Sequence, residues 1–227
     1  MQKVIKSVDL AKDIENILSQ IKYDKLFVLT DNNTDKLCYP LIQNIDEIKG
    51  ADKIIIKAGD SNKNIEALAS VWKYLSDNGA TRNSLLINLG GGTLTDLGGF
   101  AAATFKRSIK CINIPTTLLG AVDAAVGGKT GINFEGLKNE IGAFAPTLTV
   151  IIDSAFFKSL DHANFLSGYA EMLKHSLIDS DEEWKRILAF DTDNIDCEQL
   201  RELVVSYVAV KERMVEEDPF EKGIRKA

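Results

Sequence analysis

The chain has 227 residues, a formal net charge of −6 and 45% hydrophobic residues. This composition is typical of a globular protein that buries a sizeable core, as one large domain or two smaller ones. The negative charge argues against a general nucleic-acid or membrane surface, so an anionic ligand would need local cations. Cys38, Cys111 and Cys197 form no C-x-x-C pair, which favours reduced thiols in a cytoplasm over a disulfide framework or a thiolate metal site. We expect no signal peptide and no membrane-spanning segment.

The first two thirds of the chain alternate between helical patterns and short apolar runs. Helices are expected at 9–22 and 63–78, and strands at 26–30, 54–56, 85–89, 110–115 and 147–153. This alternation predicts a mostly parallel α/β sheet covered on both faces, a Rossmann-like arrangement. Two long helical patterns, 165–178 and 197–216, follow without strand signals. We therefore expect an α/β domain at 1–154 and a helical domain at 155–227.

The strand expected at 85–89 runs into three glycines, Gly90 to Gly92, then Asp96 and an Ala-rich helical stretch. A strand, a glycine turn and a helix start can form an anion site, because backbone N–H groups can approach a phosphate closely there. The spacing is not G-x-G-x-x-G, and a tight turn that needs positive φ explains the glycines equally well.

Polar or glycine-rich residues follow four of the expected strands. These are Asp31-Asn32-Asn33, Gly59-Asp60, Gly90 to Gly92 and Thr116-Thr117. Ligands of such sheets bind beyond the carboxyl ends of the strands, so we expect these segments to share one rim and a binding site.

Residues 123–139 form a Gly-rich segment that carries Asp123, Lys129, Lys138 and Asn139. Gly128-Lys129-Thr130 matches the end of a P-loop, but Asp123 stands where that motif needs its first glycine, which argues against a nucleoside triphosphatase. A surface loop with solvated lysines and a phosphate site made by lysines and an amide both remain open, with the second favoured.

Glu171 and Lys174 would share one face of a helix, and their apolar neighbours suggest partial burial. A half-buried carboxylate needs a cation or a metal, although a surface ion pair is the commoner arrangement. His175 lies four residues after Glu171, and we interpret it as structural. The segment from Lys211 to Arg225 is, by composition, a charged and solvated helix and turn.

Taken together, these segments resemble the 3-dehydroquinate synthase family of the shikimate pathway. The resemblance extends from Asp31 onward, and its most specific stretches are Gly90-Gly91-Gly92…Asp96…Gly99-Phe100, Pro115-Thr116-Thr117-Leu118-Leu119, Asp123…Val126-Gly127-Gly128-Lys129-Thr130-Gly131, Gly136-Leu137-Lys138-Asn139 and Gly168…Glu171…Lys174. It implies NAD bound in the α/β domain and a divalent metal, zinc or cobalt, in the helical domain. It also implies conversion of 3-deoxy-D-arabino-heptulosonate 7-phosphate to 3-dehydroquinate and phosphate, with NAD acting catalytically.

The resemblance also assigns residues. Those implied to bind the cofactor are Asp31, Asn33, Asp60, Lys63, Gly91, Gly92, Asp96, Thr116, Thr117, Lys129, Lys138, Phe156 and Ser159. Those implied to bind the substrate are Asp123, Lys129, Asn139, Lys174, Lys211, Arg225 and Arg107, of which Arg107 would reach the neighbouring subunit of a homodimer. Glu171 is the implied metal ligand. Lys211 and Arg225 would grip the substrate carboxylate, which suits a cation and a bidentate guanidinium.

The chain departs from the family pattern at several places. Ser108 stands where the family usually has glycine, and Thr95 replaces a frequent glycine. The family pattern continues beyond Ala227 with two histidine metal ligands that neither His162 nor His175 matches. We therefore expect a truncated, inactive piece with an incomplete metal site. The alternatives are a sister sugar-phosphate cyclase, a metal-dependent polyol or glycerol dehydrogenase, and a non-catalytic NAD-binding module.

Overall fold

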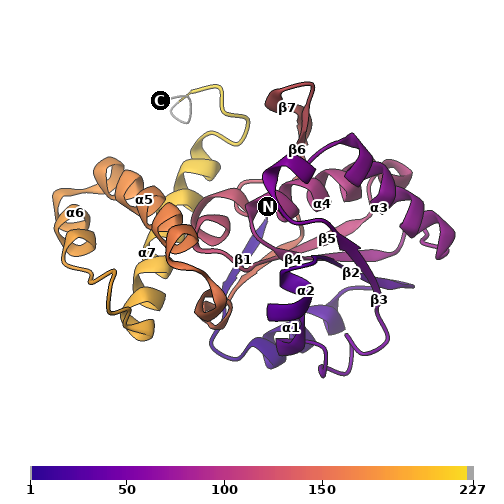
Figure 1. Cartoon of the computed structure of the whole chain (residues 1–227), viewed down its shortest axis with the longest axis horizontal. Helices are drawn as coiled ribbons and strands as arrows, with labels where there is room; N and C mark the ends of the chain where they lie inside the picture. The colour runs from indigo at the N-terminus through magenta and orange to yellow at the C-terminus, as the bar shows by residue number, and fades with distance from the viewer. Residues whose placement is uncertain (1, 224–227) are drawn as a thin grey trace.

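A six-stranded parallel sheet lies at the centre of the computed structural model, which describes residues 2–223 (Figure 1). The strand order is β1-β8-β5-β4-β2-β3, and every pairing is parallel. The strands are β1 (Lys3–Lys6), β2 (Leu26–Asp31), β3 (Asp52–Ile56), β4 (Leu85–Gly90), β5 (Lys110–Pro115) and β8 (Thr149–Ile152). The predicted α/β class is confirmed. Only β1 was not expected, because four residues with lysine at both ends carry little strand signal.

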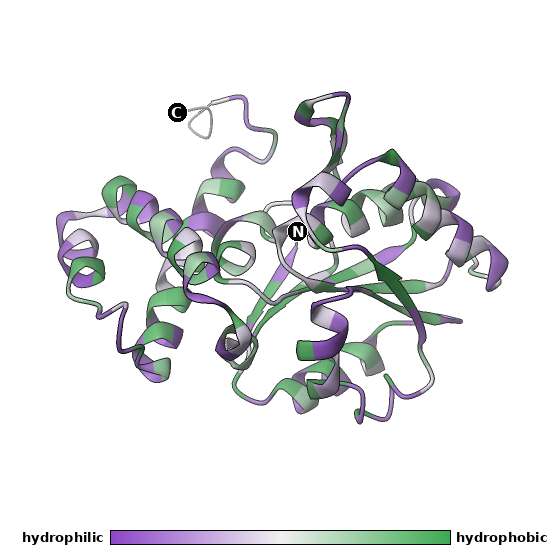
Figure 2. Ribbon diagram, viewed as in Figure 1, coloured by the Kyte–Doolittle hydropathy of each residue, from purple (hydrophilic) through white to green (hydrophobic). Residues whose placement is uncertain are grey.

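Helices cover both faces of the sheet. α1 (Leu10–Gln20) and α2 (Thr34–Leu37) lie on one face, and α3 (Ile65–Asp77) and α4 (Gly92–Thr104) on the other (Figure 1). Neighbouring strand residues point to opposite faces, so Val28 packs with the α1 side and Phe27 with the α3 side. Because both faces are buried, the central strands are apolar along their length (Figure 2).

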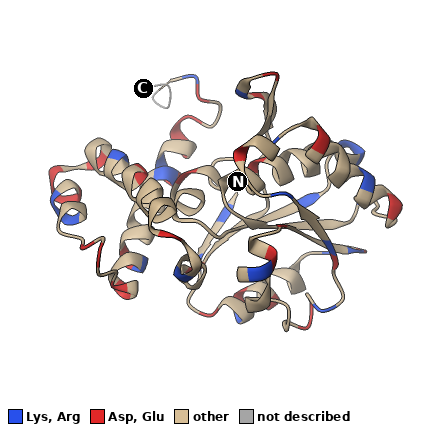
Figure 3. Ribbon diagram, viewed as in Figure 1, with Lys and Arg blue, Asp and Glu red and all other residues tan. Residues whose placement is uncertain are grey.

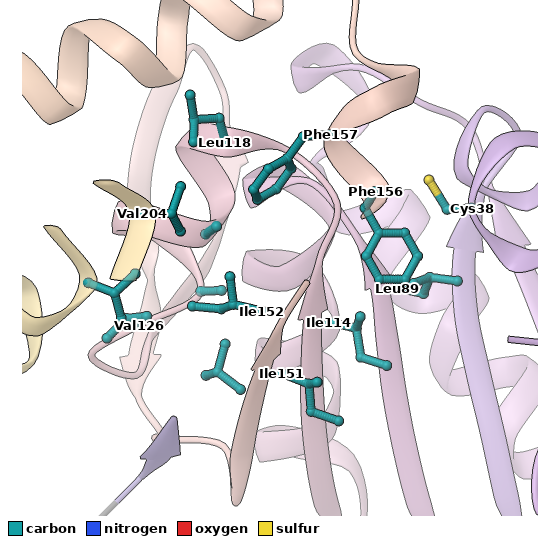
Figure 4. Packing of buried hydrophobic residues seen from close by; sticks show 14 of the residues in the cluster. Cys38, Leu89, Ile114, Leu118, Val126, Ile151, Ile152, Phe156, Phe157 and Val204 are labelled. Carbon is teal, nitrogen blue, oxygen red and sulfur yellow. The ribbon is translucent and has the colours of Figure 1, made fainter. Parts of the chain in front are cut away.

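Helices follow the last strand: α5 (His162–Asp179), α6 (Asp181–Leu188) and α7 (Cys197–Glu217). They share one continuous hydrophobic cluster with the sheet, in which Leu118 and Ile152 pack close to Phe157 and Val204 (Figure 4). Short helical turns complete the chain: η1 (Tyr39–Leu41), η2 (Asp60–Asn62), η3 (Phe105–Arg107), η4 (Gly120–Ala124) and η5 (Ser154–Ser159). No described helix is both long enough and apolar enough to cross a membrane.

A two-stranded antiparallel hairpin, β6 (Lys129–Phe134) and β7 (Leu137–Phe144), stands beside α4 (Figure 1). This hairpin was not expected, since the sequence of residues 123–139 indicates only a Gly-rich segment. Its glycines are required because the two backbones approach closely: a Cβ on Gly142 would lie 2.0 Å from the carbonyl oxygen of Thr130. Such glycines weaken the alternation that identifies a strand.

The loop after α4 is strained. Lys106, Arg107 and Ser108 have positive φ values of 47°, 64° and 87°. Ser108 combines its φ with a ψ of 120°, outside the left-handed region that side chains tolerate best. The glycine expected here from the family pattern thus has a conformational reason, since glycine adopts such angles without a steric cost.

Replacing Ser108 by glycine should stabilise the chain by about 1 kcal/mol, because relief of backbone strain exceeds the extra entropy of glycine when unfolded. Urea unfolding would measure the difference. Ser70→Gly is the matched control: Ser70 lies inside α3, so the same change there should destabilise by about 0.5–1 kcal/mol. Equal losses in both variants would contradict the interpretation.

Candidate functional site

A cavity of about 490 Å³ opens at the carboxyl ends of the parallel strands. The residues predicted to bind a cofactor that line it are Asp31, Asn33, Asp60, Gly91, Gly92, Thr116, Thr117 and Ser159. The expectation that these strand ends share one rim is confirmed. Asp31 is fixed by a local turn in which its carboxylate accepts hydrogen bonds from the backbone N–H groups of Asn33 and Thr34, each at 2.8 Å.

The N-terminus of α4 faces this cavity through Gly91 and Gly92, and no side chain among residues 2–223 caps it. A Cβ on Gly91 would lie 2.9 Å from Thr117 Cγ2, and one on Gly92 would lie 2.8 Å from the Cβ of Ala124. Glycine is therefore required for close packing around this helix end. Uncapped N–H groups and the helix dipole make such an end suitable for a phosphate.

A second cavity, of about 280 Å³, lies beyond the first turn of α4. Its polar lining consists of Asp96, Asp123, Lys129, Asn139 and Glu221, together with Thr130. Four of these six residues were predicted site residues, and Thr130 and Glu221 were not. Gly92 lines the first cavity and Asp96 the second, so the two cavities lie along the same turn of one helix.

Lys63 contacts two of the residues that line the second cavity. Its side chain is only 5% exposed, and its ammonium lies 2.9 Å from an oxygen of Asp96 while also donating to Asn139 Oδ1. Burial raises the pKa of the Asp96 carboxyl above its usual range, and Lys63 opposes that shift. A buried ammonium is tolerable only with such partners.

The loop after β3, which carries Asp60 and Lys63, makes two further contacts with the hairpin. Lys138 pairs with Asp60 at 2.8 Å, and the backbone N–H of Asn133 donates to the carbonyl oxygen of Lys63 at 2.7 Å. Ion pairing with Lys138 lowers the pKa of Asp60. The loop after β3 and the hairpin are thereby fixed to one another, which sets where Asn139 enters the second cavity.

A third group of charges lies where α5 and α7 meet the turn at η4. Glu171 forms an ion pair with Lys174, and His175 Nε2 lies 3.3 Å from Glu171 Oε1. This carboxylate oxygen is buried without a well-directed hydrogen bond among the described residues. His175 and, to a smaller extent, Lys174 lower the pKa of Glu171 to about 2 against the effect of burial. Lys211 pairs with Asp123.

His175 is the main residue that the sequence interpretation set aside. Asp123, Glu171 and His175 each offer a ligand atom, and these atoms lie within 4.8 Å of one another. His175 itself is buried, and its Nδ1 has no hydrogen-bond partner among the described residues. The four-residue spacing from Glu171 was the available signal, but spacing does not reveal burial.

The remaining predicted site residues are placed differently. Phe156 is fully buried in the hydrophobic cluster and does not line the first cavity (Figure 4). Arg107 is exposed on the strained loop, outside both cavities. Arg225 lies outside the described residues.

Replacing Lys63 by glutamine should destabilise the chain by about 2 kcal/mol near neutral pH, because Asp96 would stay buried without its cation. The destabilisation caused by Lys63→Gln should be smaller in acidic buffer. The pKa of Asp96 is already raised and would rise further, and a protonated carboxyl needs no cation. Urea unfolding at both pH values would measure this. Lys73→Gln, at an exposed pair with Asp77, should cost less than about 0.5 kcal/mol, and equal losses would contradict the assignment.

Sequence comparisons match the chain to two family models, one for each part of the same family. Residues 53–167 match "3-dehydroquinate synthase N-terminal" and residues 168–227 match "3-dehydroquinate synthase C-terminal". A 3-dehydroquinate synthase of Parabacteroides distasonis is 57% identical over 226 residues, which is 100% of this chain and 64% of that protein. One of Clostridium acetobutylicum is 35% identical, over 96% of this chain and 61% of that protein. The chain thus spans less than two thirds of the length of these relatives.

Solved structures share the fold. ValA, a 2-epi-5-epi-valiolone synthase from Streptomyces hygroscopicus with bound NAD+ and Zn2+, has a TM-score of 0.83 and 25% identity, covering 99% of this chain and 64% of that one. A 2-deoxy-scyllo-inosose synthase with carbaglucose-6-phosphate, NAD+ and Co2+ has a TM-score of 0.84 and 21% identity, covering 98% and 61%. On the strength of both family matches, the chain belongs to the 3-dehydroquinate synthase family.

Proposed function

We propose that the chain provides the cofactor site and part of the substrate site of a 3-dehydroquinate synthase, which converts 3-deoxy-D-arabino-heptulosonate 7-phosphate to 3-dehydroquinate and phosphate. The α/β domain would comprise residues 1–154 and the helical domain 155–227. The enzyme would act in the cytoplasm as a homodimer, with the exposed Arg107 reaching the neighbouring site. The observation that carries the proposal is that two cavities share the first turn of α4, one lined by glycines and the other by Lys129, Asn139 and three carboxylates.

NAD fits the first cavity. Its pyrophosphate would lie at the uncapped N-terminus of α4 against Gly91 and Gly92, where a side chain would clash with Thr117 or Ala124. The remaining predicted cofactor residues on that rim would bind the rest of the molecule. When bound, NAD would accept a hydride from the substrate and return it later, so it would not be consumed.

The acidic sugar phosphate would lie in the second cavity. Lys129 and Asn139 line it, and Lys211 of α7 pairs with Asp123, which also lines it. Lysines at separate points of the cavity would hold the phosphate and the carboxylate in one register, with Lys174 nearby on α5. An anionic group could replace Glu221 or Asp123 as the partner of these lysines, whereas a neutral polyol could not, which favours an anionic substrate over glycerol.

A divalent metal fits at Glu171. Glu171, Asp123 and His175 each offer a ligand atom, and these atoms lie within 4.8 Å of one another. Carboxylate and imidazole ligands suit zinc and cobalt. When bound, the metal would acidify the substrate hydroxyl that is to be oxidised.

The function can be tested with a chimera that joins this chain to the remaining third of the Parabacteroides distasonis relative. With NAD, zinc and the heptulosonate phosphate, the chimera should release phosphate without net NADH production. Lys129→Gln in the chimera should lower kcat/KM by roughly 100-fold, because a charge-assisted contact to the phosphate is lost. Lys73→Gln, far from both cavities, should leave it unchanged.

Other outcomes would select another function. Net NADH formation from glycerol would favour a polyol dehydrogenase. Turnover of sedoheptulose 7-phosphate instead of the heptulosonate would favour a sister cyclase. NAD binding with no turnover of any of these compounds by the chimera would favour a non-catalytic module.

Metal binding can be tested on the chain itself. Titration with Co2+ should give a visible absorption band of a protein-bound ion, and Glu171→Gln should weaken binding at least tenfold through loss of a ligand. Glu202→Gln on the exposed face of α7 is the control, with the same change of charge. A band that survives Glu171→Gln unchanged would contradict the assignment.

A further inference from the structure

The segment after α7 forms a turn that contacts the β6–β7 hairpin. Asp218 is buried, and its carboxylate accepts hydrogen bonds at 2.8 Å from the backbone N–H groups of Lys222 and Gly223. Glu221 has a φ of 53° within this turn, a conformation that is uncommon for a residue with a side chain. The turn at 218–223 is therefore a defined structure with its own internal hydrogen bonds.

Two contacts hold this turn to the hairpin. The ring of Phe220 packs edge to face on Phe144 of β7, with centroids 5.8 Å apart. Glu221 Oε1 lies 3.0 Å from the ammonium of Lys129, the first residue of β6. The helical part and the hairpin are thus bridged at the second cavity, which Glu221 itself lines. Charged residues occur in both of these segments (Figure 3).

We propose that Glu221 is an internal counter-anion for Lys129, which an anionic group of the substrate must displace before it can bind that lysine. The inference rests on the proposed function, in which Lys129 holds the substrate phosphate. The Glu221 carboxylate is already paired with the Lys129 ammonium, and both residues line the second cavity. Glu221 would thereby set the affinity of the site by competition, and its displacement would release the contact between the turn and β6.

The charge balance supports displacement. A carboxylate carries one negative charge, whereas a phosphate ester carries between about 1.5 and 2 near neutral pH. Lys129 and Glu221 are 48% and 33% exposed, so their pairing is weak enough for a ligand to break. The tether keeps the carboxylate close at all times, which raises its effective concentration over that of free anions.

The test measures inorganic phosphate binding to the chain by NMR titration. The amides of Thr130 and Gly131 report on the second cavity, while those of Gly91 and Gly92 report separately on phosphate at the α4 N-terminus. Glu221→Gln should tighten binding at Thr130 and Gly131 by about two- to fivefold and leave Gly91 and Gly92 unaffected. Asp77→Asn, which frees the exposed Lys73, is the matched control and should change neither.

Two further variants test whether the effect of Glu221 depends on the turn and on Lys129. Phe220→Ala should loosen the turn and tighten phosphate binding in the same direction as Glu221→Gln. In a Lys129→Gln background, Glu221→Gln should have no effect, because the competition requires the lysine. The inference would be overturned if Lys129→Gln weakened phosphate binding but Glu221→Gln left it unchanged or weakened it. The proposed function would still stand in that case. If Lys129→Gln did not weaken binding at Gly131, the phosphate assignment itself would fail, and the inference with it.

Discussion

The buried ammonium of Lys63 is the interaction on which the site depends. It joins three segments that are distant in the chain: the loop after β3, the first turns of α4 through Asp96, and the hairpin through Asn139. Removing an ammonium from water is costly, so the folded state must supply both partners together. This one cluster therefore fixes the loop after β3, α4 and the hairpin relative to one another around the second cavity.

The polar groups around the second cavity form a set of matched pairs. Lys129 pairs with Glu221, Lys211 with Asp123 and Lys174 with Glu171. Each cation comes with its own carboxylate, so the cavity is close to neutral in the absence of a ligand. A ligand therefore exchanges one set of ion pairs for another, which limits its net gain in binding energy but makes recognition sensitive to the placement of its charges.

The sequence was most informative where one physical rule dominates. Buried parallel strands give short apolar runs, and their carboxyl ends share one rim, so the sheet and the first cavity could be predicted. The hairpin could not, because Gly131 and Gly142 serve a close backbone approach that no periodicity reveals. The roles of Glu221 and His175 depend on contacts between distant elements, and local spacing carries no information about those.

The helices α5 to α7 and the sheet share a single apolar cluster, in which Val204 of α7 and Ile152 of β8 are both buried. Bending the molecule between its two parts would expose these side chains to water. Any change in the width of the second cavity would therefore come from the hairpin and the 218–223 turn, whose mutual contacts include the Phe144–Phe220 and Lys129–Glu221 pairs. The sheet and the helices α5 to α7 would then form one rigid body without a hinge between them, and local motion would be confined to these two segments.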